Sequence, residues 1–407
     1  MSTENFKPII RFVVMSDVHL KDEHTVEHDR LVKAINDAYK IAEAHPDYKS
    51  LDALILDGDF ANSGSEAQMQ RAKQILDENL KEETKGIYAI ASHEFRGNGV
   101  EAGYEKLKRI LGSDGDTHEV IKGFHFVAVS PAKGVCVDDA KIAWTREKLT
   151  LAHKDDPKKP VFMFQHPHVS GTVYGSINWG EDELNVVYND FPQILVFSGH
   201  SHAPINDPRS IHQQHYTCLG TGTLSYFELD EFDKICNTIP ENSKEAAQML
   251  IVEADADNRV RVYPYDILTG NFFQYVWKID VPSDPETFIY TDAKRYKEAL
   301  APYFKDGAAA QVSDITESGV KITFPQATCD DQPFVNSYDI ILRRKSDNVI
   351  ESQQSIWSEY YFYNMPETRE FVFNNLEPNT EYVGKITAKG FFHNCSSNYL
   401  TVEFKTK

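Results

Sequence analysis

Residues 10–19 read IRFVVMSDVH, an apolar run that ends directly in Asp17 and His19. The same pattern recurs further along the chain, in residues 54–59 (LILDGD), 87–94 (IYAIASHE), 160–168 (PVFMFQHPH) and 194–202 (ILVFSGHSH). In an α/β protein, functional side chains gather at the carboxyl ends of the strands. Because each run ends in carboxylate or imidazole groups, the five clusters are expected to meet in space.

Helical and extended segments alternate around these clusters. The hydrophobic pattern predicts strands at 9–16, 53–57, 87–91, 124–129, 160–165 and 194–198, and helices at 27–44, 65–80, 101–111 and 139–154. Beyond residue 200 it predicts strands at 215–220, 249–253, 260–265 and 272–279, with a hairpin turn at 254–258. Short apolar strands alternating with helices indicate a central sheet covered on both faces, and the later strands are expected to close a second sheet against the first.

The C-terminal part of the chain has a different character. A connecting helix is predicted at 292–303, followed by strands at 320–324, 338–342, 371–373, 382–386 and 401–404. Residues 376–382 read LEPNTEY. This segment resembles the Leu-x-Pro-x-Thr-x-Tyr signature of fibronectin type III domains, in which the tyrosine bonds back to the upstream backbone. The resemblance implies an all-β sandwich at the C-terminus.

Composition restricts the possible partners. The 407 residues are 41% hydrophobic and 12% aromatic, enough to build folded cores. With 62 acidic and 42 basic residues the net charge is −20, which disfavours binding to nucleic-acid backbones but allows a local site where bound cations reverse the sign. No apolar run reaches 18 residues and the N-terminus does not resemble a signal peptide, so we expect neither a membrane span nor a membrane partner.

The cysteines indicate a reducing compartment. They are odd in number, widely separated and without the CxxC spacing of a metal or redox motif, at Cys136, Cys218, Cys236, Cys329 and Cys395. We therefore expect free thiols and a cytoplasmic protein.

The order of the five clusters resembles the signature of calcineurin-like metallophosphoesterases: D-x-H, G-D, G-N-H-[DE], H and G-H-x-H, here spanning Asp17 to His202. The resemblance implies a four-layer α/β/β/α sandwich. It places this domain at residues 1–290, a connecting helix or linker at 291–308 and the fibronectin type III-like sandwich at 309–407.

The same resemblance implies two metal ions. One would be held by Asp17, His19 and His202, the other by His166 and His200, with Asp59 bridging the two. Mixed carboxylate and imidazole ligands suit Mn²⁺, Fe or Zn²⁺ better than Ca²⁺. Such a pair clamps a phosphate and generates a bridging hydroxide for in-line attack. His93 would then act as general acid, or stabilise charge, at the leaving oxygen.

Two positions depart from the family pattern. Ser92 stands where the family has an asparagine ligand, and a serine hydroxyl is a shorter and poorer ligand for the second ion. Asn62 stands where some members have an aspartate that orients the catalytic histidine, and an Asp-to-Asn change in such a role can reduce the rate by about 10⁴.

Neighbouring residues are weaker candidates. Glu94 is interpreted as structural. His168 is interpreted as an exposed loop histidine, with substrate contact as the alternative. The loop at 169–183 carries Tyr174 and Trp179 and is expected to overhang the metals, where it could stack on an aromatic or nucleoside group.

Two hypotheses about function follow. The first is a metal-dependent hydrolase of small phosphoesters, with diesters favoured over monoesters and nucleotides included among the substrates. The second is a binding scaffold that kept the fold and lost the reaction, for which Ser92 is the motive. In either case the C-terminal domain is expected to act as a spacer or to bind another protein.

Overall fold

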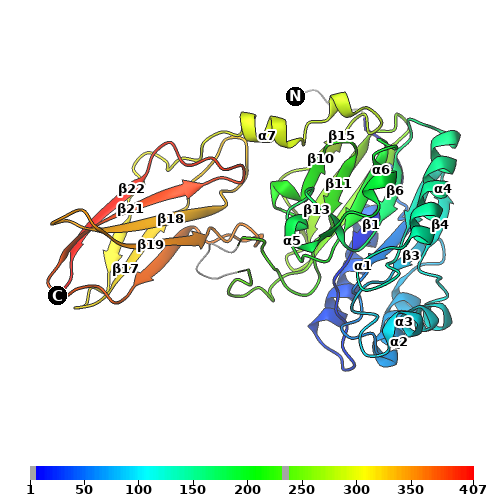
Figure 1. The fold of residues 1–407 in the computed structure, drawn as a ribbon, viewed down its shortest axis with the longest axis horizontal. Coiled ribbons are helices and arrows are strands. Elements are labelled where there is room, and N and C mark those ends of the chain that lie inside the picture. Colours follow the sequence, from blue (N-terminus) through cyan, green and yellow to red (C-terminus); the bar gives the residue numbers. More distant parts are fainter. Residues whose placement is uncertain (1–5, 232–237) are drawn as a thin grey trace. The chain divides into compact units, whose positions relative to one another are not determined.

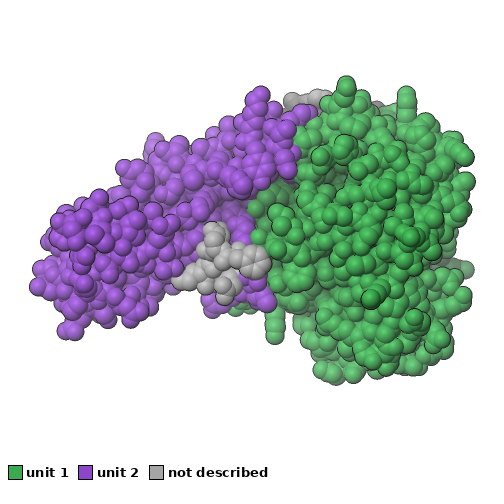
Figure 2. All heavy atoms as spheres, in the orientation of Figure 1, with its two compact units in different colours: residues 1–230, 242–291 green, residues 231–241, 292–407 purple. Residues whose placement is uncertain are grey.

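The computed structural model describes residues 6–231 and 238–407 and forms two compact units (Figures 1 and 2). Unit 1 comprises Met1–Asp230 and Asn242–Thr291, and unit 2 comprises Glu231–Glu241 and Asp292–Lys407. The sequence did not predict that residues 231–241 group with the C-terminal part. Cys236 lies outside the described residues, and the four described cysteines are free thiols.

The first sheet of unit 1 has seven strands in the order β14-β13-β12-β1-β2-β3, with β15 paired to β13. Its strands are β1 (Pro8–Met15), β2 (Ala53–Asp57), β3 (Lys85–Ala89), β12 (Gln248–Asp255), β13 (Val260–Asp266), β14 (Asn271–Phe272) and β15 (Trp277–Ile279). β1, β2 and β3 run parallel, and β12 joins β1 antiparallel. The carboxyl ends of β1, β2 and β3 therefore lie at the same edge.

The second sheet has six strands in the order β10-β11-β9-β6-β5-β4. They are β4 (Thr117–Ile121), β5 (Phe124–Ala128), β6 (Val161–Phe164), β9 (Ile194–Ser198), β10 (Ile211–Gln213) and β11 (Thr217–Gly220). β5, β6, β9 and β11 are parallel. The two-residue strands β7 (His168–Val169) and β8 (Gly180–Glu181) pair separately beside them.

Side chains alternate along the strands and build three cores. Phe12 and Val14 of β1 point between the sheets, where they meet Phe126 of β5, while Val13 and Met15 face the helices. The helices of unit 1 are α1 (Val26–Ala44), α2 (Glu66–Asn79), α3 (Gly99–Lys106) with a π-helical turn at Leu107–Leu111, α4 (Asp139–Asp155), α5 (Ser176–Trp179) and α6 (Asn185–Tyr188). α1 and α2 pack on the outer face of the first sheet, and α4 and α6 on that of the second. The predicted four-layer α/β/β/α fold is confirmed.

Several predicted elements differ in extent. The strand expected at 272–279 is two short strands, β14 and β15, and the helix expected at 292–303 ends earlier, as α7 (Asp292–Glu298). Edge strand β4 and the short elements of the loop at 169–183 were not predicted, because segments this short carry little periodicity. No helix among the described residues is both long and apolar enough to cross a membrane.

Unit 2 is a sandwich of a three-stranded sheet, β16-β17-β20, and a four-stranded sheet, β19-β18-β21-β22. The strands are β16 (Gln311–Ser313), β17 (Val320–Pro325), β18 (Ser337–Arg344), β19 (Ile350–Trp357), β20 (Thr368–Phe373), β21 (Glu381–Lys389) and β22 (Leu400–Lys405). The backbone N–H of Glu377 donates to Oη of the buried Tyr382 at 3.0 Å. The predicted all-β domain and its tyrosine corner are confirmed. Strand β19 was not predicted, because its five central residues, 351–355, are all polar and half-buried or exposed.

Candidate metal centre

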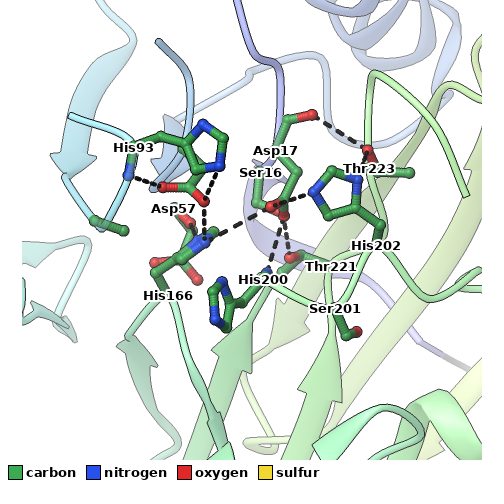
Figure 3. A network of polar contacts seen from close by, with 12 residues as sticks. Ser16, Asp17, Asp57, His93, His166, His200, Ser201, His202, Thr221 and Thr223 are labelled. Atoms are coloured by element: carbon green, nitrogen blue, oxygen red, sulfur yellow. Dashed lines mark hydrogen bonds and ion pairs between the residues drawn. The ribbon is translucent and has the colours of Figure 1, made fainter. Parts of the chain in front are cut away.

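The five predicted clusters meet where the carboxyl ends of the two sheets adjoin. β1, β2 and β3 contribute from the first sheet, and β6 and β9 from the second. Figure 3 shows His166, His200 and His202 around the carboxylate of Asp17, with His93 close by. Among the described residues, three groups at this centre have ligand atoms within 4.8 Å of one another. Asp17, His19 and His202 form the first cluster, Asp59, His166 and His200 form the second, and His19, Asp59 and His93 form the third group.

The first cluster centres on Asp17. Its Oδ1 lies 3.2 Å from Nε2 of His202 and 3.9 Å from Nε2 of His19. The two imidazole nitrogens are themselves 3.1 Å apart. The other carboxylate oxygen, Oδ2, is held by the Ser16 hydroxyl and by the backbone N–H of His200 at 3.1 Å. Oδ1 is therefore the oxygen that faces the imidazoles.

The second cluster adjoins the first through His166. Its Nε2 lies 3.0 Å from Oδ2 of Asp59 and 3.6 Å from Oδ1 of Asp17. Asp59 also groups with His19 and His93. Asp59 is thus the residue whose carboxylate lies between the ligand atoms of both clusters, as the resemblance implied for a bridging ligand.

The residues fit a pair of divalent cations. Oδ1 of Asp17 and Nε2 of His166 are buried and have no partner in hydrogen-bond geometry among the described residues, although Oδ1 lies 3.2 Å from Nε2 of His202 and Nε2 of His166 lies 3.0 Å from Oδ2 of Asp59. Such groups are costly unless something satisfies them. Carboxylate and imidazole donors together suit Mn²⁺, Fe or Zn²⁺. A cation between these atoms would satisfy both.

Backbone carbonyls set the direction of three imidazoles. Nδ1 of His166 donates to the carbonyl oxygen of Asp57 at 2.7 Å, and Nδ1 of His202 to that of Tyr226 at 2.9 Å. Nδ1 of His93 donates in the same way to Asn62, at 2.7 Å. Because a carbonyl oxygen can only accept, each bond places the proton on Nδ1 and leaves Nε2 for the centre.

The bond to Asn62 differs from the prediction. We expected the side chain of Asn62 to replace an orienting aspartate, but the main chain of this residue holds His93. The identity of the side chain at position 62 is therefore not what fixes the His93 ring.

The backbone of the centre is strained. Asp17, His19, Asp59, His200 and His202 all have positive φ, between 49° and 72°. This left-handed region costs of order 1–3 kcal/mol for a residue with a side chain and is typical of functional sites. Gly58 has φ +83°, and a Cβ there would lie 2.5 Å from Nδ1 of His166. Only glycine lets the end of β2 approach this imidazole so closely.

Electrostatics make the centre attractive to cations. Burial alone would raise the pKa of Asp17, but the charges of His166 and His202 hold it well below its usual value. Burial lowers the pKa of His166, but Asp59 and Asp17 outweigh it and raise this pKa well above the usual value, and Asp17 raises that of His202 against burial in the same way. Burial, aided by His202, lowers the pKa of His19 to about 3, and burial with His166 lowers that of His200 to about 4. The two carboxylates therefore favour positive charge at this centre.

His93 lies at the edge of the centre. Its backbone N–H donates to Oδ1 of Asp59 at 2.9 Å, and its Nε2 lies 3.9 Å from Oδ2 of the same residue. The His93 ring is half-buried and 4.3 Å from that of His19. Ser92, also half-buried, precedes it directly. Glu94 accepts backbone N–H groups from Asp59, Ala61 and Ala91, so it supports the loops structurally.

His168 is not an exposed loop histidine. It is 1% exposed, and both ring nitrogens are bonded at 2.7 Å, Nδ1 to the hydroxyl of Ser198 and Nε2 to that of Ser201. A histidine committed at both nitrogens supports its neighbours and has no free nitrogen for a substrate. The sequence could not show this, because both serines belong to the later β9 cluster.

One neighbour of the centre was not singled out from the sequence. The ring of Tyr226 lies 4.1 Å from that of His202 and 6.2 Å from that of His19. Its backbone carbonyl is the partner of His202, so its position depends on a loop far from the first four clusters in the chain. No motif within residues 224–228 would have pointed to it.

Adjoining clusters of carboxylate and imidazole groups are the kind of ligand set that two-metal hydrolases use. Residues 10–204 match the sequence model of the calcineurin-like phosphoesterase family, in agreement with the resemblance carried by the five clusters. The family match supports a phosphoric ester hydrolase, and the residue clusters could bind metal.

Solved structures similar to this chain include a phosphatase and a fibronectin-type domain. Purple acid phosphatase PPD1 from yellow lupin (Lupinus luteus) seeds is 12% identical, with 67% of this chain and 54% of that chain covered and a TM-score of 0.47. The fn3 domain of human collagen alpha-1(XX) chain is 14% identical, with 27% of this chain and 88% of that chain covered and a TM-score of 0.20. No curated protein matches the sequence.

Proposed function

We propose that unit 1 hydrolyses small phosphoesters with two divalent ions, and diesters in preference to monoesters. One observation carries the proposal: Nε2 of His166 lies 3.0 Å from Asp59 and 3.6 Å from Asp17, so the two ligand clusters share a boundary. Adjoining sites of this kind hold two ions close enough to act on one phosphate.

The proposed ligands follow the clusters. Asp17, His19 and His202 would hold one ion and His166 and His200 the other, with Asp59 shared between them and Ser92 as a weaker ligand of the second. When bound, the ions supply Lewis acidity toward the phosphoryl oxygens and activate water for in-line attack. Manganese is the ion with which we would first test the site, because oxygen and imidazole ligands suit it.

His93 supplies the proton that the leaving group needs. As the attacking water forms its bond to phosphorus and the ester P–O bond breaks, the leaving oxygen takes a proton from Nε2 of protonated His93. The bond from Nδ1 to the carbonyl of Asn62 keeps Nε2 directed at the centre. Burial lowers the pKa of His93 and the charge of Asp59 opposes this. A lowered pKa makes the protonated imidazole a stronger acid but leaves a smaller fraction of His93 protonated near neutral pH.

Ser92 motivates the alternative of a scaffold without turnover. A hydroxyl in place of the family's amide would weaken binding of the second ion. The carboxylate and imidazole residues of the family pattern are all present in the sequence, and this favours the enzyme over the scaffold. We propose further that unit 2 is a fibronectin type III-like spacer or protein-binding module, and that nucleotides are among the substrates to be tested.

The test uses the full chain stripped of metal and reloaded with Mn²⁺. Bis(p-nitrophenyl) phosphate and p-nitrophenyl phosphate are assayed in parallel with wild type, His93→Ala, Ser92→Asn and a control, His118→Ala, whose histidine lies on β4. We expect turnover, with the diester preferred, to fall about 10²–10⁴-fold in His93→Ala and to remain in His118→Ala. Silence of the wild type with Mn²⁺, Fe and Zn²⁺ would overturn the enzyme function. Activity in Ser92→Asn alone would support the scaffold.

A further inference from the structure

Trp179 stands directly against a ligand of the second cluster. It ends the short helix α5, and its ring meets that of His200 at 5.3 Å and 89°. Edge-to-face contact at this distance is favourable for aromatic pairs. The indole is half-buried, so part of it remains accessible beside the centre.

The other aromatic residue of this loop is not available. Tyr174 is 8% exposed, and the guanidinium of Arg209 lies 3.9 Å from its ring centroid. Its hydroxyl accepts the backbone N–H of Asp230 at 2.9 Å. Ile177, by contrast, is 84% exposed on the same turn as Trp179. The accessible apolar surface of the loop is therefore formed by Ile177 and Trp179.

The turn that carries Trp179 packs closely against the residues that follow β9, which include His200 and His202. Gly175 has φ +92°, and a Cβ there would lie 2.5 Å from Cβ of Ser201, the residue between His200 and His202. The N–H of Trp179 donates to the carbonyl of Gly175 at 3.1 Å, and the next residue, Gly180, pairs with His168 in the β7–β8 bridge. The indole is thus placed before any ligand arrives, which lowers the entropic cost of a contact.

We propose that Trp179 contacts the substrate and gives the centre its preference for phosphoesters whose organic group is a planar aromatic ring, whether an aryl group or a nucleobase. This inference rests on the proposed function, because it assumes that the phosphate lies at the metal clusters. A ring attached to that phosphate can then stack or pack on the indole. The side chain acts on binding of the organic group, and the metal ligands act on the phosphate.

Binding, measured without turnover, tests the inference. Calorimetry with the Mn²⁺-loaded full chain compares phenylphosphonate with methylphosphonate, which share the charged head and differ in the ring. We expect wild type to bind phenylphosphonate more tightly. Trp179→Ala should weaken phenylphosphonate about tenfold, the size of one aromatic stacking contact, and change methylphosphonate less than about twofold. Trp179→Phe should keep most of the preference, and Trp144→Phe, on α4, should keep all of it.

Three outcomes would overturn the inference: equal weakening of both phosphonates in Trp179→Ala, no change in either, or no binding of either by wild type. Equal weakening accompanied by lower manganese content would show that Trp179 only supports His200. If wild type prefers phenylphosphonate through Trp179 but hydrolyses no ester, the proposed enzyme function fails and the inference about the aromatic contact stands.

Discussion

The backbone carbonyl oxygen of Asn62 accepts a hydrogen bond from Nδ1 of His93 at 2.7 Å. Every residue type carries this backbone carbonyl, so the orientation of His93 does not depend on the side chain at position 62. In the proposed reaction the side chain of His93 donates a proton, whereas Asn62 contributes only its main-chain carbonyl.

Asn62→Ala should leave kcat within about threefold of wild type, because the carbonyl stays in place, whereas loss of an orienting side chain can cost about 10⁴. The measurement is steady-state hydrolysis of bis(p-nitrophenyl) phosphate, with His93→Ala as the inactive reference. A fall of a hundredfold or more in Asn62→Ala, at unchanged manganese content, would mean that the side chain does hold the histidine.

Manganese binding should become tighter as pH rises from 6 to 8. Asp59 and Asp17 raise the pKa of His166, and Asp17 raises that of His202, so the metal-free protein holds these protons near pH 6. Each proton that must leave contributes up to about tenfold in apparent affinity per pH unit, until pH passes the raised pKa.

The same protons stabilise the metal-free fold. Because these two pKa values are raised on folding, their contribution to the free energy of unfolding is complete below the unfolded histidine value of about 6.5 and disappears as pH rises through the folded values.

The prediction for manganese binding is tested by calorimetry in two buffers with different ionisation heats, which counts the protons released when Mn²⁺ binds. An affinity independent of pH, with no proton release, would contradict this account.

Gly58→Ala should destabilise unit 1 more than Gly97→Ala. Both glycines have positive φ, +83° and +81°, but a Cβ at Gly58 would lie 2.5 Å from His166 whereas one at Gly97 would have nothing within 4 Å. The Gly97 variant therefore measures backbone strain alone, about 1 kcal/mol. We expect Gly58→Ala to cost at least about 2 kcal/mol more, since a buried ring must move. Urea unfolding, monitored by hydrogen exchange of peptides from β1 and β2, would measure this difference in the free energy of unfolding. Equal destabilisation by the two substitutions would refute the prediction.

Tyr382→Phe should destabilise unit 2 by about 1–3 kcal/mol, because it leaves the N–H of Glu377 without its acceptor near a buried ring. Tyr399→Phe serves as the control, since Tyr399 is 56% exposed. Hydrogen exchange of peptides from β21 and β22 reports on this unit separately. Equal protection in the two variants would show that the corner bond does not contribute to stability.

Much of the centre was predictable from local sequence. An apolar run followed by Asp17 and His19, or by His200 and His202, needs only the strand and its next residues to be recognised. The LEPNTEY segment predicts the Tyr382 corner for the same reason, because the bond joins residues only five apart. Helices α1, α2 and α4 followed from their periodicity, while short edge strands such as β4 have too few residues to show one.

Long-range packing decided the rest. His168 was expected in solvent, yet packing of its segment against the end of β9 buries it between serines 30 and 33 residues away. The partners of His93, His166 and His202 are backbone carbonyls, and since every residue carries a carbonyl, no side chain in the sequence marks which one will be used. The placement of Trp179 against His200 likewise depends on how the α5 turn packs on Ser201. The sequence by itself determined which groups carry the chemistry, because their types and spacing are local. Only the tertiary structure decided which atoms hold them in place, because those contacts join segments that lie far apart in the chain.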